Sequence, residues 1–290
     1  MKNILKTTLL TAALSAGMAL SAMAAETPGK TWEDVKNSED PMEIIQVVEN
    51  LNKDVNGIDT DYLMNMTLRF GEESIPMYTT GNVKIQDANN EAMKLVMTMN
   101  MNAMGENQSI TAFYTDGWYY YDMGENGKYK LEMNYVSALQ STQTAAMNQS
   151  GLSYITDASV ERNGELTTIY FSMDGAAMTD LVNKVLAQTS GAGNVVNGPG
   201  VESQAAGLGM NIGECKGEYT LDANGNIIQQ RILMNADMSV DELTMGYEIF
   251  MEMNIKAIGD SVVVTVPSTE GFPTMEEYLQ QILAESGAAA

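Results

Sequence analysis

The sequence predicts an α+β protein in which helices pack on one strongly curved antiparallel sheet. Two observations lead to this class. Between residues 61 and 258 most segments alternate apolar with polar residues, and Gly, Asn or Asp turns separate them roughly every eight to twelve residues, as in an antiparallel meander. Amphipathic helical segments precede, interrupt and follow these strands, so the sheet offers a face on which they can bury their apolar sides.

The first 24 residues have the pattern of a cleaved export signal. Lys2 and Lys6 give a positive start, an uncharged and mostly apolar run follows over residues 7–22, and a small-x-small motif ends at Ala24. We therefore expect cleavage after Ala24, a mature chain that begins at Ala25, and a secreted, extracytoplasmic protein without an integral membrane anchor. A membrane-spanning helix is the alternative, but the run is short and rich in small residues for a bilayer span.

Cys215 is the single cysteine of the chain. A lipid-anchored protein would need a cysteine just after the apolar run, and none stands there. The sequence therefore predicts neither a lipid anchor nor an intramolecular disulfide. Between a disulfide to another protein and a reduced thiol in a half-buried strand, the sequence favours the reduced thiol.

The formal charge of −23 excludes several partners. Removal of residues 1–24 takes away Lys2 and Lys6 and no acid, so the charge becomes −25. Nucleic-acid binding is excluded, since Lys and Arg supply most of its affinity by neutralising phosphates. Adsorption on anionic lipid is disfavoured for the same reason, and the repulsion favours a soluble protein.

The first amphipathic helix opens a single domain that we place at residues 41–290, after a polar segment over 25–40. Asp40 can cap this helix, Pro41 suits its first turn, and Glu43 favours its dipole. Asn56-Gly57 supplies its end. Its apolar face is predicted to carry Ile44, Ile45, Val48, Leu51 and Val55.

Strand patterns fill most of the remaining chain. A hairpin turn is expected at Asn163-Gly164, and "DANGN" at 222–226 is expected to be another. "DANGN" also resembles the start of a calcium loop, but its glycine is one residue early and Leu233 stands where the distal Glu should be. The predicted strands cover 61–70, 76–86, 91–101, 108–116, 117–123, 128–133, 154–173 (as one hairpin), 213–221, 227–240, 243–258 and 261–267.

Further helices are predicted between and after these strands. Residues 175–188 form a second amphipathic segment, followed by a flexible Gly-rich loop at 189–211. A capping box of Thr274 with Glu277 begins a C-terminal helix. In "GWYYYDM", residues 117–123, aromatic side chains alternate between both faces of a strand, which predicts one face in the core and the other partly covered.

The chemistry-bearing residues indicate a protein that is not an enzyme. The chain contains no histidine, which removes the commonest general base and histidine-ligated metal sites. No nucleophile elbow, phosphate-binding loop or CxxC motif is present, and no pair of carboxylates stands out from the acidic background. We predict no catalytic residues, no cofactor and no metal site.

Methionines at every second position are the most unusual feature, as in "VMTMNMNAM" at residues 96–104. Three interpretations compete. Thioethers suit Cu(I), but strand alternation explains the spacing fully, because it points all the sulfurs to one buried face. A solid core and the wall of an adaptable apolar cavity both remain, and methionine's flexibility favours the cavity. The predicted ligand-binding residues are Met64, Met66, Met97, Met99, Met101, Met251 and Met253.

The order of these elements carries a resemblance. An N-terminal helix, a Met- and Tyr-rich meander with "DGWYYYDM…GKYKLEM", a central helix, "GEYTLDANGNI" and a final "VTVP" resemble secreted proteins and lipoproteins of Gram-positive bacteria that look like the LolA/LolB/LppX superfamily. The resemblance implies an unclosed half-barrel whose concave face, covered by helices, holds acyl chains.

The sequence thus predicts an exported protein that binds or carries a lipid or an acylated envelope component in a methionine-lined cavity. An extracellular interaction or structural protein with a solid core is the first alternative, and a Cu(I) binder is the second.

Overall fold

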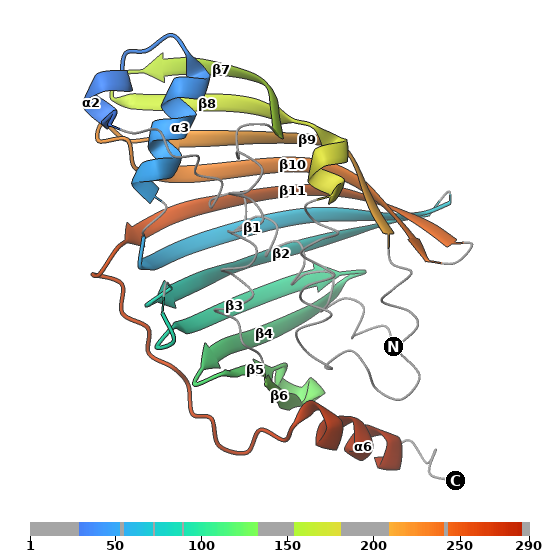
Figure 1. Cartoon of the computed structure of the whole chain (residues 1–290). Helices are drawn as coiled ribbons and strands as arrows, with labels where there is room; N and C mark the ends of the chain where they lie inside the picture. Colours follow the sequence, from blue (N-terminus) through green and yellow to red (C-terminus); the bar gives the residue numbers. More distant parts are fainter. Residues whose placement is uncertain are drawn as a thin grey trace.

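The computed structural model describes residues 29–52, 55–71, 73–88, 90–132, 154–180, 209–240 and 243–285. Eleven antiparallel strands form one twisted sheet in the order β6-β5-β4-β3-β2-β1-β11-β10-β9-β8-β7 (Figure 1). The strands are β1 (Gly57–Phe70), β2 (Glu73–Gln86), β3 (Lys94–Ala103), β4 (Glu106–Thr115), β5 (Trp118–Asp122), β6 (Lys128–Glu132), β7 (Ile155–Asn163), β8 (Leu166–Met173), β9 (Gly209–Leu221), β10 (Ile227–Val240) and β11 (Leu243–Ile258).

The sheet is built from two meanders that meet in its centre. The chain runs outward from β1 to β6, resumes with β7 at the opposite edge, and returns inward to β11, which pairs with β1. Because β6 and β7 lie at opposite edges, the sheet is unclosed. The predicted single antiparallel sheet is confirmed, but the described chain is mostly β, with fewer and shorter helices than the α+β prediction implied.

Helices α2 (Trp32–Val35) and α3 (Pro41–Asn52) lie on one face of the sheet, over β7 to β10 (Figure 1). We call this the inner face and the opposite one the outer face. Along most of the long strands every second side chain is buried, and most of these side chains form one core cluster with the apolar residues of both helices. The period of two therefore sets which residues face the helices.

Helix α3 begins as predicted and ends differently. The Asp40 carboxylate accepts hydrogen bonds from the backbone N–H groups of Met42 (2.9 Å) and Glu43 (3.4 Å), which caps the helix. Leu51, predicted to face the core, is 49% exposed. Leu51 lies in the last turn of α3, and Glu49 is the last buried residue of this helix.

The "DANGN" segment is the hairpin turn between β9 and β10. The Asp222 carboxylate accepts hydrogen bonds from the backbone of Asn224 (2.8 Å) and Asn226 (2.9 Å), and Gly225 takes φ +82°. The Trp32 indole N–H donates to the Ala223 carbonyl at 2.8 Å, which fastens α2 to this turn. The polar segment 25–40 therefore contributes Trp32 to the core.

Aromatic side chains of β5 are buried on both faces, as predicted. Tyr119 and Tyr121 join the inner-face core. On the outer face Tyr120 stacks on Phe113 (ring centroids 4.7 Å apart), and the edge of Phe272 covers both rings. The C-terminal segment thus shields the outer face at β4 and β5.

The predicted strand at 261–267 is wrong. Both neighbours of β1 are already in place, so this segment has no strand edge beside it, and it runs as an irregular chain to the other end of the sheet (Figure 1). The Val264 backbone N–H donates instead to the Gln86 side-chain oxygen at 2.9 Å. The segment leads to α6 (Met275–Glu285), which begins with the predicted Thr274–Glu277 capping box and packs beside β6.

Several predictions lie wholly or partly outside the described residues. The export signal and Ala24 and Ala25 are among them. Residues 175–180 are helical, as predicted, whereas 181–188 and most of the Gly-rich loop fall outside. Residues 209–211, predicted to be in that loop, belong to β9. The domain boundaries stay a prediction.

Candidate functional site

The seven methionines predicted as ligand-binding all lie on the inner face and are buried, with exposed fractions between 1% and 7%. Alternation along β1, β3 and β11 places them there, because each occupies a buried position of its strand. The same face carries five further buried methionines from the long strands, which are Met77, Met173, Met234, Met238 and Met245. A role for any of them in ligand binding stays a prediction.

The strand register divides the predicted residues into two groups. Met64, Met66, Met251 and Met253 lie together at the β1–β11 pair, where Met64 is directly opposite Met251. The β3 group consists of Met97, Met99 and Met101, and β2 separates it from β1.

A threonine and a glycine of β2 lie between the two methionine groups. Thr79 lies between Met64 and Met101, and Gly81 lies between Tyr62 and Met99. A Cβ on Gly81 would come within 2.7 Å of the Tyr62 hydroxyl, so glycine makes room for that ring. Tyr62 can therefore reach across β2 and donate to the Thr98 carbonyl of β3 at 3.4 Å.

Glu49 is the polar exception among the apolar contacts of α3. The residue is 4% exposed, and its Oε2 atom has no hydrogen-bond partner among the described residues. Desolvation raises the pKa of this carboxyl to about 8. Burial is the larger cause that raises the pKa of Tyr219 on β9, and the nearby Glu49 charge raises this pKa further. Tyr219 is opposite buried Gln230 of β10, so polar groups of three elements meet under α3.

Sequence reasoning missed this polar group. Glu49 follows Ile45 by four residues, so helical periodicity placed it on the buried side of α3. Gln230 precedes Ile232 by two residues and shares its face for the same reason. The signal was present in both cases, but charged and amide side chains are mostly exposed, which argued against it.

The sulfur atoms of the inner face include that of Cys215. Cys215 of β9 lies between Met173 of β8 and Met234 of β10 in the register. Burial raises the pKa of this thiol to about 12, which disfavours the thiolate that a soft metal would require. Among the described residues, no group of three or more His, Cys, Asp or Glu is placed to hold a metal ion.

These features define a class of protein: an open antiparallel sheet with an apolar, methionine-rich inner face partly covered by short helices. The chain belongs to a family of unknown function, DUF6612, whose model matches residues 40–267. A search of curated protein sequences gives no match.

Three solved structures are similar to this chain at low sequence identity. LprF from Mycobacterium bovis is 11% identical with a TM-score of 0.40, covering 80% of this chain and 97% of that chain. Lipovitellin, described with its lipid–protein interactions, is 8% identical with a TM-score of 0.32 (74% of this chain, 26% of that chain). A putative outer membrane lipoprotein-sorting protein domain from Vibrio parahaemolyticus is 9% identical with a TM-score of 0.19 (83% and 97%). The chain is thus similar to LprF and to a lipoprotein-sorting protein domain, in line with the predicted resemblance to the LolA/LolB/LppX superfamily, and neither membership of that superfamily nor any residue role follows from this similarity.

No helix in the described part of the chain is both long and apolar enough to cross a bilayer.

Proposed function

We propose that this chain is an exported, non-enzymatic protein that binds or carries an apolar molecule, such as a lipid or an acylated envelope component, against the inner face. The supporting observation is the gathering of methionines from β1, β2, β3, β8, β10 and β11 on one face. Methionine has three side-chain torsions and a polarizable sulfur, so such a face can fit ligands of variable shape.

Burial of an acyl chain on the inner face would supply enough free energy for binding. Each buried CH₂ contributes about 0.8 kcal/mol, so an acyl chain of ten carbons gains roughly 8 kcal/mol before ordering costs. The methionines must move to admit a chain, because they are buried in this structure. Their flexibility lowers the cost of that movement relative to Leu or Ile.

A second function, an extracellular interaction protein with a solid core, is favoured by one observation. The described residues form one pocket on β7 to β11 and another beside α6, and neither methionine group lines either of them. Native mass spectrometry of protein purified from its own host separates the candidates: an added acyl mass supports the carrier, no added mass supports the solid core, and a copper mass supports the Cu(I) binder.

The direct test uses Met99→Glu with a fluorescent fatty-acid probe and a thermal midpoint. The new charge would be desolvated against the acyl chain, so probe affinity should fall strongly. The matched control is Thr98→Glu, which adds the same charge to the exposed outer face of the same strand. If the wild type binds no probe and Met99→Glu simply fails to fold, the methionines form a solid core.

A further inference from the structure

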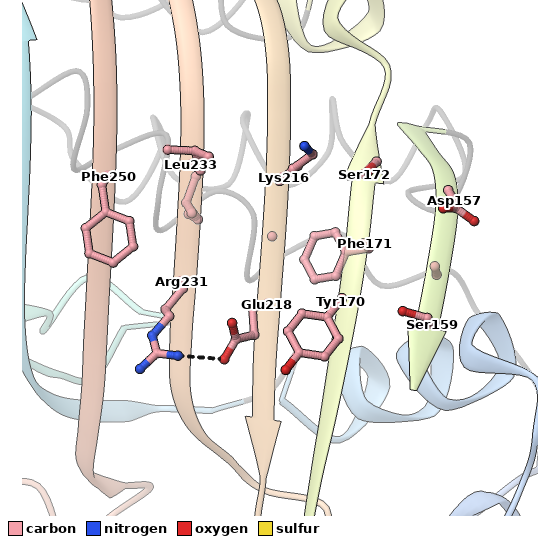
Figure 2. A pocket seen from close by; sticks show the side chains of 13 residues that line it. Asp157, Ser159, Tyr170, Phe171, Ser172, Lys216, Glu218, Arg231, Leu233 and Phe250 are labelled. Carbon is pink, nitrogen blue, oxygen red and sulfur yellow. Dashed lines mark hydrogen bonds and ion pairs between the residues drawn. The ribbon is translucent and has the colours of Figure 1, made fainter. Parts of the chain in front are cut away.

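The outer face of β8 to β11 carries a groove that the proposed function does not use. Its volume is about 330 Å³, within the size range of small-ligand sites. We call it the outer-face groove and define it by Tyr170, Glu218, Arg231, Leu233 and Phe250, whose side chains Figure 2 shows on four neighbouring strands.

The register explains how these side chains come together. Tyr170 of β8 is opposite Glu218 of β9, which is opposite Arg231 of β10. In the next row Leu233 is opposite Phe250 of β11. A polar row that contains the Tyr170 ring therefore lies beside a row that is apolar at β10 and β11 and continues with Lys216 on β9.

The charges of the groove are compensated internally. The Arg231 Nη1 donates to Glu218 (3.0 Å), and its Nε donates to Glu252 (2.8 Å). The other groove cation, Lys216, pairs with Glu214 at 2.5 Å. An anionic ligand would meet carboxylates and paired cations on a chain of charge −23, so charge complementarity points to a neutral ligand.

The two ion pairs also hold the planar groups in place. Arg231 has five N–H donors in a fixed fork, and only these two bonds occupy them among the described residues. The remaining donors and the Glu218 carboxylate can serve neighbouring hydroxyl groups of a ligand without first being ordered. Ser159 and Ser172 add hydroxyls at the β7 side of the groove.

The aromatic and apolar parts of the groove are open. Tyr170 and Leu233 are each 41% exposed. By contrast, Phe272 covers the outer-face rings of Phe113 and Tyr120, so the exposed Tyr170 ring differs from these two covered rings. Exposed apolar surface rimmed by polar groups is typical of an interaction site.

We propose that the outer-face groove binds a neutral, hydroxyl-rich oligosaccharide. A sugar ring has an apolar C–H face that can pack on the exposed Tyr170 ring, and hydroxyls at its rim that Arg231 and Glu218 can hydrogen-bond. The inference is independent of the inner face and of any apolar ligand there.

The test is a titration of the full mature chain, monitored by calorimetry or NMR. The ligands are a panel of neutral hexasaccharides of glucose, mannose, galactose and N-acetylglucosamine. At least one member should bind. Tyr170→Ala should weaken that binding by about tenfold or more, because a central aromatic contact is lost. Arg231→Lys keeps the charge and loses the planar fork, and should weaken it too.

The matched control is Tyr78→Ala, since Tyr78 is 55% exposed on β2 and lies outside the groove. It should leave the affinity unchanged. Absence of binding to the whole panel overturns the proposal, and so does binding that Tyr170→Ala leaves intact. Equal or tighter binding of an acidic hexasaccharide or of an extended peptide with the same dependence on Tyr170 would also overturn it.

Discussion

Met64 of β1 and Met251 of β11 lie directly opposite each other at the strand pair that joins the two meanders of the sheet. Both side chains are almost fully buried on the inner face. Leu or Ile at this central position would specify the packing more tightly, because their rotamers are more restricted. The sheet therefore has an adaptable contact where its two halves meet.

The first prediction replaces this pair by leucine. The double variant Met64→Leu with Met251→Leu conserves volume, so its unfolding free energy should stay within about 1.5 kcal/mol per site of the wild type. Its tolerance for ligand shape should fall, because leucine adapts less. Denaturant unfolding, and affinities for a saturated and a cis-unsaturated fatty-acid probe of equal length, measure the two effects.

The control for this pair is Met104→Leu, at an exposed turn position outside the core. It should change neither quantity. If the double variant keeps the wild-type ratio of the two affinities, methionine flexibility does not determine ligand choice at this position.

The second prediction concerns Glu49. Its pKa is about 8 in the folded chain against 4.5 when solvated, so the unfolded state loses its proton first as pH rises. The folded state is therefore favoured most below pH 4.5, and that advantage is lost progressively up to about pH 8. At roughly 1.4 kcal/mol per pKa unit, the loss amounts to several kcal/mol. Glu49→Gln should raise stability at pH 8 and flatten its pH dependence.

Urea unfolding at pH 5, 6.5 and 8 measures this effect. The control is Glu43→Gln on the same helix, where the hydrogen bond and charge of Lys30 lower the pKa of the carboxyl. That variant should not raise stability at pH 8. A wild-type and a Glu49→Gln curve that run parallel across this range would show that the buried carboxyl does not control the pH dependence.

The third prediction compares two glycines in hairpin turns. Gly225 and Gly164 both have positive φ (82° and 65°), so alanine at either costs about 1–2 kcal/mol of backbone strain. A Cβ at Gly225 would also lie 2.6 Å from the Trp32 ring, whereas nothing lies within 4 Å at Gly164. Gly225→Ala should therefore destabilise more than Gly164→Ala, and Trp32 fluorescence should shift only in the former. Equal losses of stability in the two variants would mean that α2 does not depend on its contact with the β9–β10 turn.

Much of the sheet could be predicted because period-two alternation is a local property of each strand. The burial of Met97, Met99 and Met101 followed from it directly, as did the two faces of Tyr119 and Tyr120. The strand order did not follow from alternation, since it depends on which strand edges remain free once β1 has paired on both sides. The apolar 261–267 segment has a strand-like pattern but no free edge beside it, which is why it was wrongly predicted to be a strand.

The candidate sites also divide into features that local alternation predicts and features that depend on strand pairing. Alternation identified the inner-face methionines but not whether a ligand displaces them, because a core and a cavity wall have the same sequence pattern. The outer-face groove was not predicted at all. Glu218 and Arg231 belong to one hairpin and Tyr170 to another, and the register of β8, β9 and β10 brings the three together.

The last prediction concerns the thiol of Cys215, which is 2% exposed in β9. Burial raises its pKa to about 12, so at pH 8 the folded chain holds almost no thiolate, the form that attacks disulfide reagents. Labelling by an aromatic disulfide reagent at pH 8 should be more than about a thousandfold slower in the folded chain than in denaturant, where the pKa returns to about 8.5. Thr98→Cys in a Cys215→Ser background places a thiol on the exposed outer face of β3 and should react fast in both states. Rapid labelling of Cys215 in the folded wild type would show that β9 opens readily at this position and that the inner-face core is not closed around it.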